Sequence, residues 1–251
     1  MEVHAHTHIP TSREKKWTHY FWEFLMLFLA VFCGFLAEYQ LEHVIENQRE
    51  KKYAVSLLED LINDTADLNR DIPLWQLRAD KADSLRKEII KPPSERNNVL
   101  VYRWAADLNY NNTFLYHDRT IGQLKYSGNF RLIRKKSVAD SLVEYDAVIV
   151  TTLKEIESIH DNIITPARLL LQDQLFSSKF YEIRNDPVLF DSAVKHEPGI
   201  IMIKKGKEDV LFQYYNKVYT YRGHQLARIR FQKILQRRAT NLILLIKKEY
   251  N

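Results

Sequence analysis

The sequence predicts an all-α protein, in which one N-terminal transmembrane helix continues into an antiparallel helical bundle. The chain has only six Gly and seven Pro in 251 residues, whereas β-sandwiches, barrels and phosphate-binding loops need Gly at tight turns. One long apolar segment lies near the N-terminus, and much of the remaining chain repeats its apolar residues at helical spacing. Since 45% of the residues are hydrophobic, we expect a folded core rather than disorder.

The apolar segment at residues 24–37 has no charge, and the aromatic-rich residues from Trp17 extend it to twenty-one residues. A helix of that length spans about 32 Å, which is enough to cross a hydrocarbon core of about 30 Å. Its Leu, Phe and Val side chains favour insertion by about 4 kcal/mol, more than one acidic group such as Glu23 costs. We expect residues 17–38 to cross the lipid bilayer. A core helix is less favoured, because such helices seldom run this long without a polar face. A cleaved signal peptide is less favoured, because Phe35 is too large for a cleavage site.

The charges beside this segment predict its orientation. Basic residues at 13–16 precede it, whereas residues 38–48 contain three Glu and no Lys or Arg. Because positive charge favours the cytoplasmic side, residues 1–16 are expected to form a cytoplasmic tail and residues 39–251 an extracytoplasmic helical domain. Basic residues at 49–52 weaken this asymmetry.

Helical periodicity continues beyond the membrane segment. Apolar residues repeat at helical spacing over 54–68, and nothing breaks the pattern before Pro73. The anchor is therefore expected to continue as one helix up to this proline. A second helix is predicted from Pro73 to Ile90, because proline fits the first turn of a helix. Shorter helices are expected at 99–112 and 117–127, the latter followed by Gly128 in the left-handed conformation.

The clearest periodicity is a coiled-coil-like seam over residues 138–163. Two interleaved sets of residues recur every seven positions: Val138, Tyr145, Thr152 and Ile159, and Leu142, Ile149, Ile156 and Ile163. Pro166 is expected to kink or interrupt the far end. Residues 176–207 contain several Pro and Gly and are expected to be irregular, with at most a short extended piece at 200–203. A final helix is predicted over 207–250.

Candidate metal ligands are few. His4, His6 and His8 alternate in the N-terminal tail, so an extended chain would place three imidazoles on one side. A solvated tail without a bound metal is the more ordinary interpretation. Glu157 and His160 have the Glu-x-x-His spacing of di-iron bundles, but such centres need two copies and the sequence has one. No nucleophile elbow, zinc-protease motif or phosphate-binding loop occurs, so we expect no enzyme, no catalytic residues and no cofactor.

Basic residues are concentrated near the C-terminus, and this does not identify a binding partner. Residues 201–251 contain twelve Lys or Arg against three Asp or Glu. A solvated basic helix face explains this best, and attraction to anionic lipid is the alternative. Nucleic acid is not an expected partner. The single cysteine, Cys33, permits no intramolecular disulfide.

Three features together resemble an uncharacterised Bacteroidota family of single-pass membrane proteins. They are the anchor from Trp22 to Leu36, its helical continuation to Asp64, and the Ser-Gly-Asn-Phe-Arg-Leu-Ile segment at 127–133, followed by Leu142 and Tyr145. Trp22 stands where that family usually has Gly. The resemblance implies an inner-membrane protein with a periplasmic helical domain, and it implies no substrate. Four Asp-Ser/Thr tripeptides, at 64–66, 83–85, 140–142 and 191–193, resemble Bacteroidota O-glycosylation sites and also suit helix starts.

We therefore expect a non-catalytic membrane-anchored domain that acts in the periplasm by protein–protein interaction or by oligomerisation. Its expected partners are the bilayer, through residues 17–38, and another protein or a second copy. The alternative is a small-ligand sensory domain that signals through a partner, because bundle interiors readily form pockets.

Overall fold

The computed structural model describes residues 17–108, 114–175, 186–196, 203 and 206–250. These residues form helices and contain no strand, so the predicted all-α class is confirmed. Contacts divide the chain into two units, Met1–Lys51 and Lys52–Asn251. Helix α1 (Trp17–Ile89) contributes to both.

The first unit contains the apolar start of α1. An 18-residue window of this helix has a mean hydropathy of 2.0, and none of it is buried. Phe24, Phe28 and Phe32 stack along one side, with ring centroids 6.2 and 5.9 Å apart. The segment is long and apolar enough to cross a membrane, as a single-pass anchor must be.

The prediction that α1 ends at Pro73 is wrong, because the helix continues through this residue to Ile89. Proline lacks the N–H that would bond to the carbonyl of Asn69, and its ring crowds that carbonyl. Pro73 lies on the exposed side of the helix, where water can solvate the carbonyl. On the opposite side, Leu68 and Trp75 are buried before and after the proline, and their packing holds both halves in one helix.

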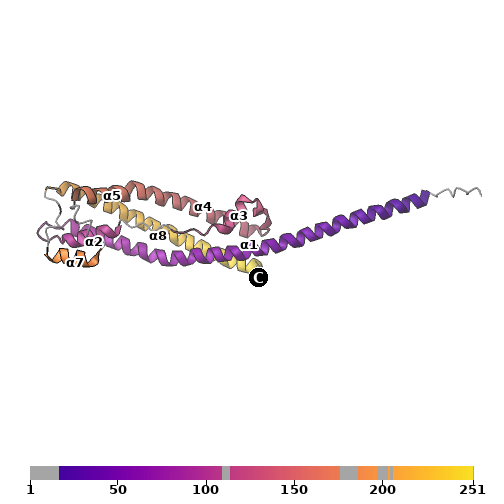
Figure 1. Cartoon of the computed structure of the whole chain (residues 1–251), viewed down its shortest axis with the longest axis horizontal. Helices are drawn as coiled ribbons and strands as arrows, with labels where there is room; N and C mark the ends of the chain where they lie inside the picture. Colours follow the sequence, from indigo (N-terminus) through magenta and orange to yellow (C-terminus); the bar gives the residue numbers. More distant parts are fainter. Residues whose placement is uncertain (1–16, 109–113, 176–185, 197–202, 204–205, 251) are drawn as a thin grey trace, which may run out of the picture. The chain divides into compact units, whose positions relative to one another are not determined.

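The long helices of the second unit are the Lys52–Ile89 part of α1, α4 (Lys136–Ile159) and α8 (Glu208–Tyr250) (Figure 1). Helix α8 is antiparallel to α1. Gln236 Nε2 donates a hydrogen bond to Asn69 Oδ1, whereas the earlier residue Arg222 contacts the later residue Asp83, with Nε 2.6 Å from Oδ1. It also packs along α4, where Arg238 Nη1 lies 3.2 Å from Glu144 Oε2. The predicted bundle is therefore present.

Short helices close the ends of the bundle (Figure 1). Helix α2 (Asn98–Leu108) starts where Asn97 Oδ1 accepts bonds from the N–H groups of residues 99 and 100. Helix α3 (Arg119–Tyr126) is followed by Gly128, whose φ of 68° confirms the predicted left-handed residue.

Between α4 and α8 the structure is more helical than predicted. Helix α7 (Pro187–His196) lies in a stretch expected to be irregular. Asp186 Oδ1 caps it by accepting bonds from the N–H groups of residues 188 and 189, and proline suits its first position. The extended piece expected at 200–203 lies outside the described residues, apart from residue 203.

Five positions of the predicted seam of α4 are buried: Val138, Leu142, Tyr145, Ile149 and Thr152. The side chains of Ile156 and Ile159 lie outside the description. Beyond α4 come π-helical turns at His160–Ile164, helix α5 (Thr165–Leu169) and a second π-helical stretch at Leu170–Leu175. The expected disturbance near Pro166 is therefore present.

The apolar core of the second unit is divided into two clusters. The Leu61 cluster joins residues 54–68 of α1 to α3, α4 and the end of α8: Ala54, Leu57, Leu61, Leu68, Phe114, Ile121, Leu124, Ile133, Val138, Leu142, Tyr145, Ile149, Leu235, Ala239, Leu242 and Ile246. The Leu85 cluster joins the end of α1 to α2 and the start of α8: Ala82, Leu85, Ile89, Val101, Tyr102, Ala105, Leu108, Ile164, Leu171, Leu175, Leu211, Tyr214, Val218 and Tyr221.

Candidate functional site: a polar layer and an adjoining pocket

Polar side chains occupy the bundle interior between the two apolar clusters. We call this set the polar layer: Asp71, Trp75 and Arg78 of α1, Thr152 of α4, and Gln225, Arg228 and Gln232 of α8. All of them are buried except Arg78, which is partly exposed. Their spacing of three, four or seven residues along α1 and α8 places them on the facing sides of these helices.

Arg228 and Trp75 form the centre of the layer. The guanidinium carbon of Arg228 lies 3.6 Å from the centroid of the Trp75 ring, and that of Arg78 lies 4.3 Å from the same ring. Arg228 is only 5% exposed. Burial lowers the pKa of Arg228 to about 10, while Asp71 acts in the opposite direction. The group is still cationic at neutral pH.

Several buried atoms of the layer have no hydrogen-bond partner. They include Trp75 Nε1, Gln225 Oε1 and both polar atoms of the Gln232 side chain, which is 1% exposed. Leaving a buried polar group unsatisfied costs about 1–3 kcal/mol, and folded proteins contain few such groups. A polar interior of this kind contributes less to stability than apolar packing does, so we take the layer as a candidate functional site.

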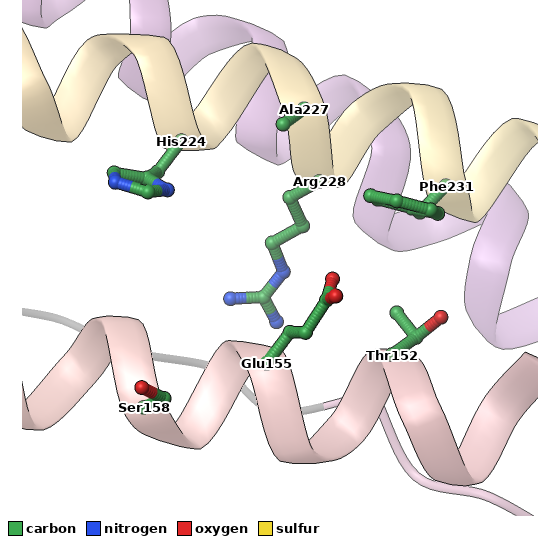
Figure 2. Close-up of a pocket in the computed structure, with 7 residues that line it drawn as sticks. All are labelled: Thr152, Glu155, Ser158, His224, Ala227, Arg228 and Phe231. Carbon is green, nitrogen blue, oxygen red and sulfur yellow. The ribbon is translucent and has the colours of Figure 1, made fainter.

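A pocket of about 350 Å³ adjoins the layer between α4 and α8 (Figure 2). Helix α4 lines it with Thr152, Glu155 and Ser158, and α8 lines it with His224, Ala227, Arg228 and Phe231. Figure 2 shows Arg228 and Glu155 pointing into this space from opposite helices. Arg228 and Thr152 belong to both the pocket and the layer, so the pocket connects the surface to the buried polar groups.

A second polar network surrounds Asp64 in the Leu61 cluster. Asp64 is 1% exposed, and it accepts hydrogen bonds from the backbone N–H of His117 at 2.9 Å and from the hydroxyl of Tyr145 at 2.9 Å. His117 Nδ1 lies 3.0 Å from the same carboxylate. Burial raises the pKa of Asp64 above its usual value, and the bonds from His117 and Tyr145 partly offset this effect.

The Asp64 network leaves no space for a ligand. The cavity beside it measures about 10 Å³, which is about the volume that one water molecule requires. Its hydrogen bonds connect α1, α4 and the segment before α3, so its role is to hold these elements together. The pocket between α4 and α8 is the better candidate for a functional site.

The side chains of the predicted metal candidates all lie outside the description. His4, His6 and His8 lie outside the described residues. Glu157 and His160 stand at the junction of α4 and the first π-helical turn, and their side chains are likewise outside the description. Within the described parts of the chain, no group of three or more His, Cys, Asp or Glu could hold a metal ion.

The periodicity of the sequence does not predict the polar layer. Gln225, Arg228 and Gln232 recur at helical spacing in α8, as do Asp71, Trp75 and Arg78 in α1. The signal was therefore present, since polar residues occupied positions where the apolar pattern of each helix should continue. Only the pairing of α1 with α8 shows that these positions meet.

Fold and site together define a helical bundle with an apolar N-terminal helix, a polar interior layer and a pocket beside that layer. Comparisons with protein-family models, curated proteins and solved structures found no match.

Proposed function

We propose that this chain is a single-pass inner-membrane protein whose periplasmic helical domain binds a small ligand between α4 and α8 and signals through a protein partner. The pocket beside the polar layer is the observation that supports this proposal. Its volume of about 350 Å³ falls within the range of small-molecule sites, about 300–1,000 Å³. Its lining combines an aromatic ring with a few charged and hydroxyl groups, as such sites usually do.

The proposed location depends on the start of α1 and on the charges beside it. None of the apolar window is buried, which suits contact with lipid. Basic residues at 13–16 and acidic residues at 38–46 support a cytoplasmic N-terminus. A C-terminal alkaline phosphatase fusion should be active, and a C-terminal fusion to a cytosol-only fluorescent protein should be dark. The reverse pattern would contradict the proposed orientation.

Ligand binding can be tested on the full chain, extracted gently from native membranes into detergent. Native mass spectrometry should reveal a small molecule that co-purifies with the wild type. Ala227→Trp fills the pocket and should abolish this adduct, whereas Ala66→Trp, at an exposed position of α1, should retain it. An adduct that survives Ala227→Trp would place the ligand elsewhere.

A second candidate function is protein–protein interaction or oligomerisation without a small ligand. Exposed apolar pairs seven residues apart favour it, because such spacing puts both members on one helix face. Val55 and Ile62 form one pair on α1, and Val143 and Val150 form another on α4. If this function is correct, Val143→Glu with Val150→Glu should release a crosslinked partner or second copy, while Ala227→Trp should not.

A further inference from the structure

Segments that are far apart in the sequence meet at one end of the second unit. Asn129 Nδ2 donates a hydrogen bond of 3.1 Å to the hydroxyl of Tyr53, which joins the 3₁₀ turn Asn129–Leu132 (η1) to the start of this unit. Lys135 Nζ lies 3.3 Å from Glu249 Oε2, which joins the start of α4 to the end of α8. Helix α3 contacts η1. We call this surface, formed by residues 52–53, 119–136 and 247–250, the basic end (Figure 1).

Positive charge is concentrated at the basic end. Residues 119–139 contain six Lys or Arg and no Asp or Glu. Three of the six have carboxylate partners: Arg119 with Glu59 and Asp60, Lys125 with Asp146, and Lys135 with Glu249. Within the described parts of the chain, five exposed cations of the basic end make no ion pair: Lys52, Arg131, Lys136, Lys247 and Lys248. Two exposed carboxylates nearby, Asp118 and Asp140, oppose these five, so positive charge remains in excess.

The basic end is also where the chain enters the second unit. Residues 39–51 are helical and lie between the expected membrane segment and Lys52, the first residue of this unit. A helix of that length spans about 20 Å, and the lipid headgroup region takes up about 5–8 Å of this distance. A short tether raises the effective concentration of headgroups at the surface to which it is attached. Chain connectivity therefore favours the bilayer as the partner of this surface.

An aromatic side chain accompanies the positive charges. Tyr126 ends α3 and is 93% exposed. Tyrosine is enriched at membrane–water interfaces, where its ring contacts apolar groups and its hydroxyl stays hydrated. We propose that the basic end binds the anionic phospholipid headgroups of the bilayer that anchors α1. This inference goes beyond the proposed ligand binding, and it rests on the proposed membrane anchor.

The expected attraction follows from the number of cations. A Lys or Arg close to an anionic membrane contributes about fivefold to the binding equilibrium. This attraction falls off within the Debye length, which is about 8 Å at physiological salt. Several solvated cations on one tethered surface are therefore sufficient, and no closed binding pocket is required.

The experiment uses the full chain in lipid nanodiscs that contain a headgroup-labelled nitroxide lipid as a fluorescence quencher. The discs consist of phosphatidylcholine, with or without phosphatidylglycerol. Cys33→Ser removes the single cysteine, and Gln123→Cys then places a fluorophore at an exposed position of α3. Phe212→Cys provides the control position, since residue 212 is exposed and adjoins Leu211 of the Leu85 cluster.

The fluorophore at position 123 should be quenched strongly in phosphatidylglycerol discs and weakly in phosphatidylcholine discs. At position 212, quenching should be weak in both. The quenching at position 123 should disappear at about 1 M salt, where the Debye length falls to about 3 Å. Equal quenching at position 123 in both kinds of disc would overturn the proposal.

A charge reversal tests the basic end without removing an ion pair that the described residues make. Lys136→Glu with Lys247→Glu should lower the ratio of bound to free surface at least about twentyfold in phosphatidylglycerol discs. Lys87→Glu with Lys195→Glu, at exposed positions of α1 and α7, makes the same change in net charge and should leave the quenching unchanged. Both double variants should keep the wild-type Tm, because all four side chains are exposed. An equal loss of quenching in the two double variants would also contradict the proposal.

This proposal and the earlier ones fail separately. A chain that does not enter the discs would contradict the anchor, whereas a chain that enters them without quenching at position 123 contradicts only the headgroup contact. If that chain binds soluble polyphosphate instead, the basic end takes a soluble polyanion and the proposal is wrong. The ligand adduct that depends on Ala227 is measured independently and should persist in Lys136→Glu with Lys247→Glu.

Discussion

Tyr145 and His117 hydrogen-bond to a carboxylate, Asp64, that is almost fully buried in the Leu61 cluster. A buried carboxylate is tolerated only when its oxygen atoms have partners, so each of these bonds contributes to stability. Burial also raises the pKa of the Tyr145 hydroxyl, with the charge of Asp64 as a further cause. Tyr145 is thus a neutral hydrogen-bond donor at neutral pH.

Tyr145→Phe removes one of these donors without leaving a cavity. We expect it to lower the free energy of unfolding by about 1–3 kcal/mol, because Asp64 then has one unsatisfied buried oxygen. Tyr126→Phe, at a side chain that is 93% exposed, is the control and should change stability by no more than about 0.5 kcal/mol. Thermal unfolding of the full chain in micelles, followed by circular dichroism, measures both. Equal effects of the two substitutions would contradict the role given to Asp64.

Glu88 has the opposite pKa shift from Asp64. Burial tends to raise the pKa of Glu88, but hydrogen bonds from Lys91 Nζ and the Asn97 backbone N–H, each 2.7 Å long, and the charge of Lys91 outweigh it. The pKa of Glu88 therefore lies below its usual 4.5. A lowered folded-state pKa means that the folded chain binds the proton less well than the unfolded chain does.

The contribution of Glu88 should be fully present above pH about 4.5 and should be lost as the pH falls through the lower folded-state pKa. Glu88→Gln should reduce stability at pH 7 and flatten the acid side of the stability profile. Glu95→Gln, at an exposed neighbouring position, should keep the wild-type profile. The measurement is Tm against pH from 7 to 3, and parallel curves for wild type and Glu88→Gln would disprove the assignment.

At the scale of the elements, the sequence predicted those helices whose signal is local. The buried positions of α4 follow from periodicity alone, and the left-handed conformation of Gly128 follows from its position after a helix. The break expected at Pro73 was wrong because tertiary packing of Leu68 and Trp75 overrides the local preference of proline. The polar layer was missed because it depends on which helices pair, and periodicity within one helix does not specify that.

Pro73→Ala should stabilise the protein. Proline inside a helix is about 3 kcal/mol less favourable than alanine, and alanine restores the hydrogen bond to the carbonyl of Asn69. Since Pro73 is exposed, the new side chain meets no crowding, and we expect a gain of about 1–3 kcal/mol. Pro187→Ala is the control and should change little, because proline suits the first position of α7. A loss of stability in Pro73→Ala would show that α1 requires proline there.

At the scale of the whole molecule, the anchor can be tested by its insertion energy. Arginine near the centre of a membrane helix costs about 2.5–3.5 kcal/mol, so Leu29→Arg with Phe32→Arg outweighs the apolar gain of about 4 kcal/mol. The wild type should stay with membranes after carbonate extraction, and this double variant should be released. Val55→Arg with Ile62→Arg, at exposed positions of the second unit, should remain in the membrane fraction. Release of the wild type would contradict the anchor.

The division of the interior into the Leu61 and Leu85 clusters has a consequence for motion. Parts of one domain can open separately, each as a cooperative group. The polar layer between the Leu61 and Leu85 clusters couples them less strongly than apolar packing would, so we expect the two clusters to open separately. Amide hydrogen exchange should therefore be fastest, among the buried parts of α1 and α8, around Trp75 and Arg228, and the segments on either side should exchange as two distinct sets. A ligand bound beside the polar layer would slow amide exchange in both sets together. Binding at one position would therefore make the whole bundle more rigid.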